Sequence, residues 1–347
     1  MEIIRSNKTK INDVEFKKLS FGKTFTDHMF LCEFKDGKWN SPKIIPYDNF
    51  SISPASSVFH YGQAIFEGMK AYKDNDNNVW LFRPEENYNR LNKSCERMCM
   101  PKIEKDLFFN GIKELLTIDK EWIGKGDTTM YIRPVVFATE ATIVASPSKE
   151  FSFFILCSPA SAYYFNPLSV LIEDTFIRAA KGGVGYAKAA GNYAGSFYPT
   201  SLAIEKGFDQ IVWTDSVNHK LIEEAGTMNI FFRINNKLIT PEHTDTILDG
   251  VTRKSVITVA KDSGIDVEIR DIEVSEIIQE YENGNLTEVF GAGTAAVIAP
   301  ISSFGYKEKK YILKDIDDAF GPIIKKKITD IQNNLTEDKY NWRYQVI

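Results

Sequence analysis

The stretch Gly182-Gly183-Val184-Gly185-Tyr186-Ala187-Lys188-Ala189-Ala190-Gly191-Asn192-Tyr193 places one lysine among glycines, alanines and two tyrosines. Only a neutral amine is a nucleophile, and small apolar neighbours favour the neutral form because they strip water from an ammonium group. Glycines also let a flat cofactor lie close to the backbone. The stretch therefore indicates either a lysine that attacks a carbonyl or an ordinary glycine-rich loop with a solvated lysine.

Composition narrows the class of protein. A chain of 347 residues is long enough for two domains and a sizeable core. The formal net charge of -5 gives no support to a nucleic-acid or anionic-membrane partner. No apolar run approaches the length of a membrane span, and Met1–Lys8 lacks the hydrophobic core of a signal peptide. We expect a soluble, cytoplasmic protein that binds neither nucleic acid nor membrane.

The cysteines and histidines give no sign of a metal site. Cys95 and Cys99 are four residues apart, but no histidine or further cysteine lies near them in the sequence. The four histidines form no pair with metal-ligand spacing. We expect no bound metal and four reduced, mostly buried thiols at Cys32, Cys95, Cys99 and Cys157.

The first half of the chain has the pattern of an α+β domain. The Asp36-Gly37 pair between two apolar runs predicts a hairpin over residues 30–39. Further strands are expected at 68–72, 79–82, 129–138 and 151–157, with helices from Pro84 to before Pro101 and over 105–122. The segment 158–167 breaks this pattern and reads as a linker.

The second half is richer in short strands. We expect strands at 169–173, 209–214, 227–234, 237–240, 266–270 and 288–290, and helices at 194–206, 253–262, 275–283 and 321–333. Many strands with few helices favour a barrel-like or sandwich-like α+β domain, because no regular βαβ array is visible. The predicted organisation is a small N-terminal α/β domain over 1–158, a linker over 159–167 and a larger C-terminal domain over 168–347.

Two segments could bind an anion. Asp249–Ser255 leads through Gly250 into a predicted helix, whose free amides and Thr252 hydroxyl would suit a phosphate. Taken alone, this segment is explained more simply as an ordinary capped helix. Gly291–Ala296 follows the strand 288–290 and resembles a backbone nest for an anion, although a tight turn has the same composition.

Three further features could serve a cofactor or substrate. A carboxylate in Glu223–Phe231 could keep a pyridine nitrogen protonated, although an acidic turn is the simpler interpretation. Arg83, Arg90 and Arg97 recur every seven residues, either as a phosphate-binding arginine or as a solvated basic face. Tyr131 and Arg133 share one side of a strand and could meet a carboxylate or form a cross-strand ion pair. Together these features supply what pyridoxal phosphate requires.

The same residues resemble the branched-chain amino acid aminotransferases, which are class IV, pyridoxal-phosphate-dependent enzymes of fold type IV. The likeness covers nearly the whole chain and is greatest to the larger, eukaryote-like branch. The matching segments, in order, are 21–29, 61–72, 81–101, 131–134, 182–193, 224–231, 248–253 and 288–295. The resemblance implies a small N-terminal α/β domain and a larger C-terminal pseudo-barrel domain, assembled as a homodimer.

The resemblance also implies roles for individual residues. Lys188 would form the internal aldimine and shuttle the proton, Tyr193 would bind the phenolic oxygen, and Glu224 would pair with the pyridine nitrogen. Leu248 would pack against the ring, and the phosphate would be held by Arg90, Val251, Thr252 and Thr294. Thr227 would lie beside both the cofactor and the substrate carboxylate, and the remaining substrate-binding positions would be Phe25, Tyr61, Phe66, Tyr131, Arg133 and the Ala295 amide.

The implied activity is a reversible, ping-pong transamination of L-leucine, L-isoleucine or L-valine with 2-oxoglutarate. Alternatives with the same fold are a D-amino-acid aminotransferase and an aminodeoxychorismate lyase; an alternative of another class is a catalytically silent cofactor-binding or scaffold protein. The chain departs from animal members in lacking a Cys-x-x-Cys pair after Gly293-Thr294-Ala295, in having Tyr186-Ala187 before the lysine, and in a shorter segment at 162–167.

Overall fold

The computed structural model describes residues 1–161 and 166–347, which form two compact units. Among the described residues, the first unit contains 1–161, 187–191 and 331–347, and the second contains 166–186 and 192–330. The chain therefore returns to the first unit twice. This division differs from the expected boundaries, in which everything after residue 167 belonged to one C-terminal domain.

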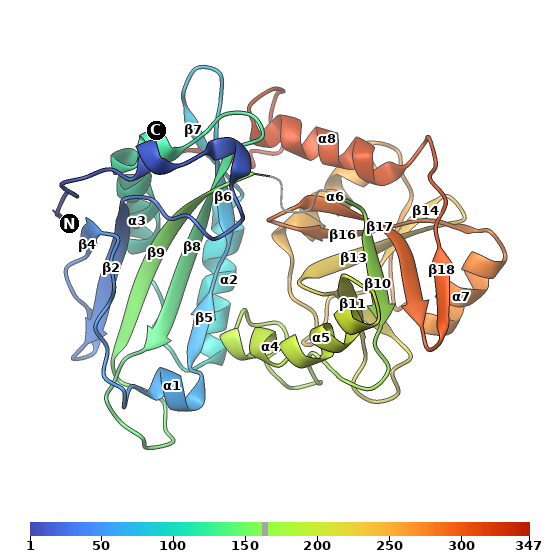
Figure 1. Ribbon diagram of the computed structural model, residues 1–347, viewed down its shortest axis with the longest axis horizontal. Helices are drawn as coiled ribbons and strands as arrows, with labels where there is room; N and C mark the ends of the chain where they lie inside the picture. Colours follow the sequence, from blue (N-terminus) through green and yellow to red (C-terminus); the bar gives the residue numbers. More distant parts are fainter. Residues whose placement is uncertain (162–165) are drawn as a thin grey trace. The chain divides into compact units, whose positions relative to one another are not determined.

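One sheet forms the centre of the first unit, and the strand order along it is β1-β4-β2-β9-β8-β6-β7-β19, with β3 paired to β2 and β5 paired to β8 (Figure 1). Its strands are β1 (Glu2–Ile3), β2 (His28–Lys35), β3 (Lys38–Trp39), β4 (Lys43–Pro46), β5 (Ala64–Phe66), β6 (Met69–Lys73), β7 (Val79–Phe82), β8 (Thr129–Ala138), β9 (Phe151–Ala160) and β19 (Arg343–Gln345). Its helices are α1 (Ser57–Tyr61), α2 (Pro84–Arg97) and α3 (Lys105–Ile118), with short 3₁₀ turns at Ile11–Asp13, Phe16–Lys18 and Lys120–Trp122.

Local sequence explains several of these elements. Asp36 and Gly37 have φ angles of 55° and 77°, the left-handed values that a tight two-residue hairpin turn requires between β2 and β3. Helix α2 begins with Pro84 at its first position, where a proline loses no hydrogen bond. Gly111 of α3 lets the helix approach the sheet, because a Cβ there would lie 2.9 Å from the Phe30 ring.

The second unit is built on a curved sheet with the strand order β12-β11-β10-β17-β16-β13-β14-β15, with β18 on β17. Its strands are β10 (Leu168–Ile172), β11 (Gln210–Thr214), β12 (Ile222–Ala225), β13 (Met228–Ile234), β14 (Lys237–Thr240), β15 (Val267–Ile269), β16 (Leu286–Gly293), β17 (Val297–Tyr306) and β18 (Lys309–Ile312). Because β12 also pairs with β13, the order from β12 through β10, β17 and β16 to β13 closes on itself. The closed cycle confirms the barrel-like architecture expected for this half.

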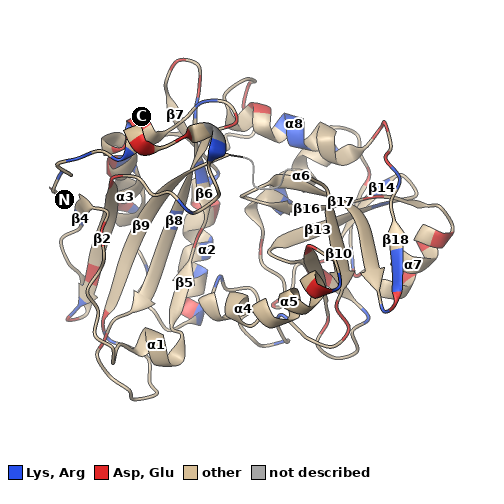
Figure 2. Cartoon of the chain, viewed as in Figure 1, with Lys and Arg blue, Asp and Glu red and all other residues tan. Residues whose placement is uncertain are grey.

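The helices of the second unit are α4 (Ala190–Ala194), α5 (Phe197–Glu205), α6 (Val251–Asp262), α7 (Val274–Glu282) and α8 (Phe320–Gln332), the first and last of which also contain residues of the first unit. Basic and acidic residues are interspersed along the elements, as on α8, and do not gather on one of them (Figure 2). Within residues 1–161 and 166–347, no helix combines the length and apolar character needed to cross a membrane.

The structure corrects the expected elements in several places. The helix expected at 194–206 corresponds to α5, which begins three residues later and is preceded by the separate short helix α4, and α6 begins two residues before the expected start. Strand β9 continues to Ala160, so residues 158–160 of the expected linker are part of the sheet, whereas 162–165 lie outside the described residues. Of the cysteines, Cys99 is exposed and the other three are buried, as expected for most of the thiols.

Asp74 connects the C-terminal segment to the first unit's sheet. Its carboxylate accepts hydrogen bonds from the Asn78 backbone N–H (2.9 Å), Trp80 Nε1 (2.8 Å) and Asn334 Nδ2 (2.9 Å). Burial would raise its pKa, but these hydrogen bonds, with the Trp80 side chain contributing most, lower it to about 2.

We predict that Asp74→Asn lowers the free energy of unfolding by about 1–3 kcal/mol at neutral pH, because it removes hydrogen bonds to a charged acceptor. The folded-state pKa of Asp74 lies below the ordinary value of 3.8. The stability that the ionised Asp74 contributes is therefore present above pH 3.8 and is lost as the pH falls towards about 2. Denaturant unfolding at several pH values measures it, with the exposed Asp76→Asn as control. A difference between wild type and variant that does not shrink in acid would contradict the prediction.

Candidate active site

The backbone around Lys188 is held firmly within the first unit. Ser94 Oγ of α2 accepts the Lys188 backbone N–H at 2.9 Å, and the Phe66 backbone N–H donates to the Lys188 carbonyl at 3.1 Å. Ala189 forms a β-bridge with Ile65, and both alanines that flank Lys188 are buried. The lysine side chain is half-buried, and its Nζ lies 5.0 Å from the centre of the Phe66 ring. The backbone of Lys188 is thus fixed by α2 and β5, unlike that of a lysine on a loose, solvated loop.

Arg90 alone among the three regularly spaced arginines is buried. Its Nε donates to Glu67 Oε1 at 2.7 Å, and its Nη2 donates to Glu67 Oε2 at 2.9 Å. Arg83, in contrast, pairs with Glu86 at 3.4 Å and lies over the Trp342 ring. The helical face suggested by the seven-residue spacing is therefore not one basic surface.

Glu67 is a residue that the sequence analysis did not single out. It is fully buried, and its Oε2 also accepts hydrogen bonds from Asn87 Nδ2 at 2.8 Å and the Gly68 backbone N–H at 3.0 Å. Burial would raise its pKa, but the charge and hydrogen bonds of Arg90, the charge of Lys188 and the Asn87 hydrogen bond together lower it. The sequence feature that could have drawn attention to Glu67 is its place within the apolar run Ala64–Met69, because a carboxylate that is buried with such a run needs a buried partner.

Phe66, Tyr131 and Arg133 form one cluster. Arg133 Nη2 donates to the Tyr131 hydroxyl at 2.9 Å, and the guanidinium lies 4.5 Å from the centre of the Phe66 ring. Arg133 Nε is buried without a hydrogen-bond partner, and the ion pairs found in residues 1–161 and 166–347 do not include Arg133. This favours the carboxylate-binding interpretation over the cross-strand ion pair.

The other two aromatic positions have different neighbours. Phe25 stacks on Tyr47, with 4.8 Å between ring centres. Tyr61, at the end of α1, is 46% exposed and its hydroxyl donates to the Ile143 carbonyl. Their place in a substrate pocket remains a prediction.

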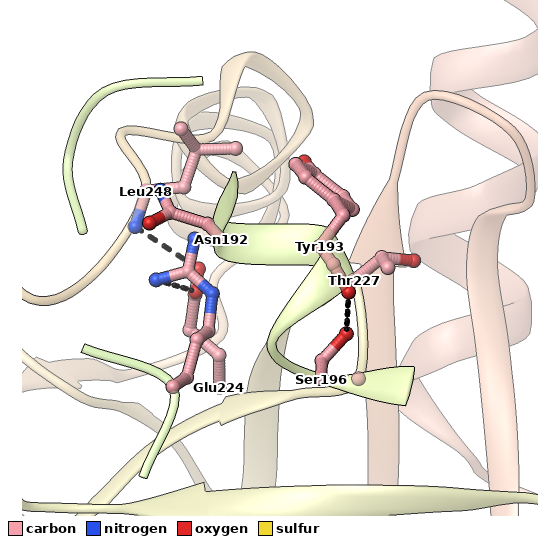
Figure 3. A pocket seen from close by; sticks show the side chains of 8 residues that line it. Asn192, Tyr193, Ser196, Glu224, Thr227 and Leu248 are labelled. Carbon is pink, nitrogen blue, oxygen red and sulfur yellow. Dashed lines mark hydrogen bonds and ion pairs between the residues drawn. The ribbon is translucent and has the colours of Figure 1, made fainter. Parts of the chain in front are cut away.

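Residues of the second unit line a small pocket around Glu224, shown in Figure 3. Glu224 Oε1 accepts hydrogen bonds from the Leu248 backbone N–H at 3.0 Å and Asn229 Nδ2 at 3.1 Å, and Oε2 pairs with Arg178 Nη1 at 2.9 Å. The antiparallel register places Glu224 opposite Asn229 on β12 and β13. The pocket is lined by Arg178, Asn192, Tyr193, Ser196, Glu224, Gly226, Thr227 and Leu248.

Helix α6 presents its N-terminus beside the same network. Gly250 precedes the helix, and a Cβ there would lie 1.9 Å from Asn229 Oδ1, so this turn requires glycine. Val251 and Thr252 occupy the first turn and are buried. Thr294 and Ala295 are half-buried in the turn between β16 and β17. The helix amides and the Thr252 hydroxyl are suited to a phosphate dianion.

The residues fit the chemical groups of pyridoxal phosphate. Both oxygens of the buried Glu224 carboxylate face donors, as is typical of an ionised carboxylate, and an ionised carboxylate can keep a ring nitrogen protonated. The first turn of α6 offers amide donors to a phosphate. The predicted residues of the first unit are Phe25, Tyr61, Phe66, Arg90, Tyr131, Arg133 and Lys188; those of the second are Tyr193, Glu224, Thr227, Leu248, Val251, Thr252, Thr294 and Ala295.

Comparison with known proteins identifies the family of the chain. Residues 64–304 match the family described as Amino-transferase class IV. The chain is 45% identical to a probable branched-chain-amino-acid aminotransferase of Staphylococcus aureus, with 94% of this chain and 93% of that protein covered. It is 44% identical to branched-chain-amino-acid aminotransferase 2 of Bacillus subtilis, with coverage of 94% and 92%.

Solved structures show the same fold. The branched-chain aminotransferase of Thermoproteus uzoniensis, solved with norvaline, has a TM-score of 0.77 at 23% identity and covers 92% of this chain and 100% of its own. The Escherichia coli branched-chain amino acid aminotransferase has a TM-score of 0.77 at 24% identity, with coverage of 92% and 99%. These likenesses confirm the predicted two-domain, fold type IV architecture.

The chain belongs to the class IV aminotransferases. Within them it belongs to the branched-chain-amino-acid aminotransferases, as its relatives over nearly its whole length indicate. The family predicted from the sequence is thereby confirmed.

We predict that Glu67→Gln lowers the free energy of unfolding by about 3–5 kcal/mol, because it leaves the buried Arg90 charge without a counter-ion. The matched control is Glu86→Gln on α2, whose half-buried carboxylate pairs loosely with Arg83 and should cost under about 1 kcal/mol. Denaturant unfolding of both variants measures the difference. Equal losses would show that burial of the Glu67–Arg90 pair has no special role.

Proposed function

We propose that this protein transfers the amino group of L-leucine, L-isoleucine or L-valine to 2-oxoglutarate, reversibly and with pyridoxal 5'-phosphate as cofactor. One observation carries the proposal: the Phe66 ring lies 5.0 Å from Lys188 Nζ and 4.5 Å from the Arg133 guanidinium. A nucleophilic amine and a carboxylate-binding group thus lie over the same aromatic ring. An α-amino acid presents the matching pair of groups.

The cofactor, when bound, would supply an electron sink for the charge that develops at the substrate α-carbon. Lys188 would hold the cofactor and move the α-proton, and the Glu224 carboxylate would keep the ring nitrogen protonated. Tyr193 would donate to the phenolic oxygen, and Leu248 would pack against the ring. The phosphate would be bound by Arg90, Val251, Thr252 and Thr294, with Thr227 nearby.

The substrate pocket must accept both aliphatic and carboxylate side chains. The rings of Phe66 and Tyr131 offer an apolar wall, and Arg133 with the Tyr131 hydroxyl offers donors to a carboxylate. Thr227 and the Ala295 amide would face the α-carboxylate, and Phe25 and Tyr61 would complete the wall. This combination supports the branched-chain L-amino acids and glutamate as alternating substrates.

We further propose a cytoplasmic homodimer. Phe59, Ile143 and Val144 are 61%, 69% and 62% exposed, and the Tyr61 hydroxyl joins α1 to the 143–144 segment. Exposed apolar side chains that gather in this way are typical of a protein–protein contact.

Replacing Lys188 with alanine should abolish transamination, by at least about a thousandfold, because no other group would bind the cofactor covalently and move the proton. The matched control is Lys181→Ala, an exposed lysine of the same segment, which should remain active. Circular dichroism should show that both variants are folded. An active Lys188→Ala variant would refute the assignment.

The first measurement is a visible absorbance titration of the purified, cofactor-loaded protein. We expect L-leucine to remove the band of the lysine-bound cofactor and 2-oxoglutarate to restore it. A band that responds only to D-amino acids or aminodeoxychorismate would favour the alternatives with the same fold. Failure to bind the cofactor would favour a catalytically silent protein.

A further inference from the structure

Glu223 is a second buried carboxylate directly next to Glu224 on β12. It is 8% exposed, and its Oε1 accepts a hydrogen bond of 2.6 Å from the Thr246 hydroxyl. Its Oε2 is buried and has no hydrogen-bond partner among the described residues. An ionised carboxylate with one buried, unpaired oxygen is unfavourable, so this setting favours a bound proton.

The charges that face Glu223 favour the same protonation state. Three charged residues act on Glu223: the cation Arg178 and the anions Glu224 and Asp215. Arg178 Nη1 pairs with Glu224 Oε2 at 2.9 Å. Asp215, on the turn after β11, accepts backbone hydrogen bonds from Val217, Asn218, Lys220 and Leu221, which keep it ionised. Glu223 is thus influenced by two anions, Glu224 and Asp215, and the Arg178 guanidinium is already paired with Glu224.

Burial raises the pKa of Glu223 to about 7, and the Glu224 and Asp215 charges add to this effect. The Thr246 hydrogen bond and the Arg178 charge oppose it. Two neighbouring carboxylates therefore have different environments: Glu224 has strong donors on both oxygens, and Glu223 has one hydroxyl.

A short chain of hydroxyl groups connects Glu223 to solvent. Thr246 Oγ1 lies 2.9 Å from Thr244 Oγ1, and Thr244 is exposed. A hydroxyl can accept one proton while it donates another. Glu223 is therefore only two hydroxyl groups away from the exposed Thr244.

Thr246 also connects Glu223 to the Glu224 network. Arg178 Nη1 donates to the Thr246 carbonyl at 2.8 Å, and Nη2 donates to the Gly185 carbonyl at 3.2 Å. The guanidinium that pairs with Glu224 is thus held by the residue that binds Glu223. A change of charge on Glu223 acts on Glu224 through space and through this shared contact.

We propose that Glu223 is a positioning residue that holds a proton below neutral pH and, on losing it, places a second negative charge beside Glu224. The added charge would strengthen the hold of Glu224 on a protonated ring nitrogen as the pH rises. This second effect rests on the proposed role of Glu224, whereas the proton on Glu223 does not.

The first test uses the cofactor-free protein and Glu223→Gln, which keeps the shape of a protonated glutamate. The folded-state pKa is above the ordinary value of 4.5, so the stabilising contribution of the proton is present at low pH and is lost as the pH rises through about 7. Relative to Glu223→Gln, the unfolding equilibrium constant of wild type should rise on the order of a hundredfold between about pH 5 and about pH 8. Glu282→Gln, an exposed control, should follow wild type.

A ratio of unfolding constants that stays flat over this range would overturn the proposal. If Glu223→Gln does not fold, Thr246→Val tests the same point. Loss of the hydroxyl donor should move the pH-dependent change in the unfolding constant to a higher pH than in wild type. In wild type alone, an infrared carboxylic C=O band should disappear as the pH rises through about 7. A wild-type protein without such a band would also overturn the proposal.

The second test follows the visible absorbance of the cofactor-loaded protein against pH. Wild type and Glu282→Gln should show a spectral transition near pH 7 that Glu223→Gln lacks. If the unfolding data agree but the spectra of wild type and Glu223→Gln coincide, the coupling to Glu224 is wrong. If the protein binds no cofactor, the proposed function fails while the unfolding test of Glu223 still stands.

Discussion

The carboxylate of Glu224 joins its own hairpin, β12–β13, to two segments farther away in the sequence, at Arg178 and Leu248. Its two oxygens bind Arg178, Asn229 and the backbone of Leu248. Asn229 in turn faces Gly250, so the start of α6 is placed by the same contacts. A buried charge is tolerated only when it is fully paired, and this requirement fixes the loops that surround the second unit's pocket. The second unit's part of the candidate cofactor site is therefore organised around one carboxylate.

In the first unit a different buried ion pair, Glu67–Arg90, has the same role. Glu67 binds Arg90 through both oxygens, and Ser94, one turn further along α2, joins the Arg90 carbonyl to the backbone of Lys188. Such pairs contribute little net stability over apolar packing, but they are costly to break. Their value lies in fixing which way a guanidinium and a lysine backbone face, which a non-directional apolar core does not do.

Much of the fold could be predicted from local patterns. Strands β8 and β14 have the predicted bounds, because their apolar residues and flanking turns are clear. Strand β17 was missed because Pro300 and Ser302-Ser303 interrupt its apolar run, and β19 because its pairing with β7 spans most of the chain. Lys188 stood out by its neighbours in sequence and Glu224 only by the family resemblance, whereas Glu67 and Arg178 owe their importance to partners distant in the sequence.

The pairing of β19 with β7 has a consequence for how the protein is made. The first unit's sheet receives its last strand from Arg343–Gln345, so β7 stays an open edge until those residues have been synthesised. Open strand edges recruit other chains. In the folded protein β19 covers this edge of β7, whereas in the nascent chain the edge is open to pairing with other chains.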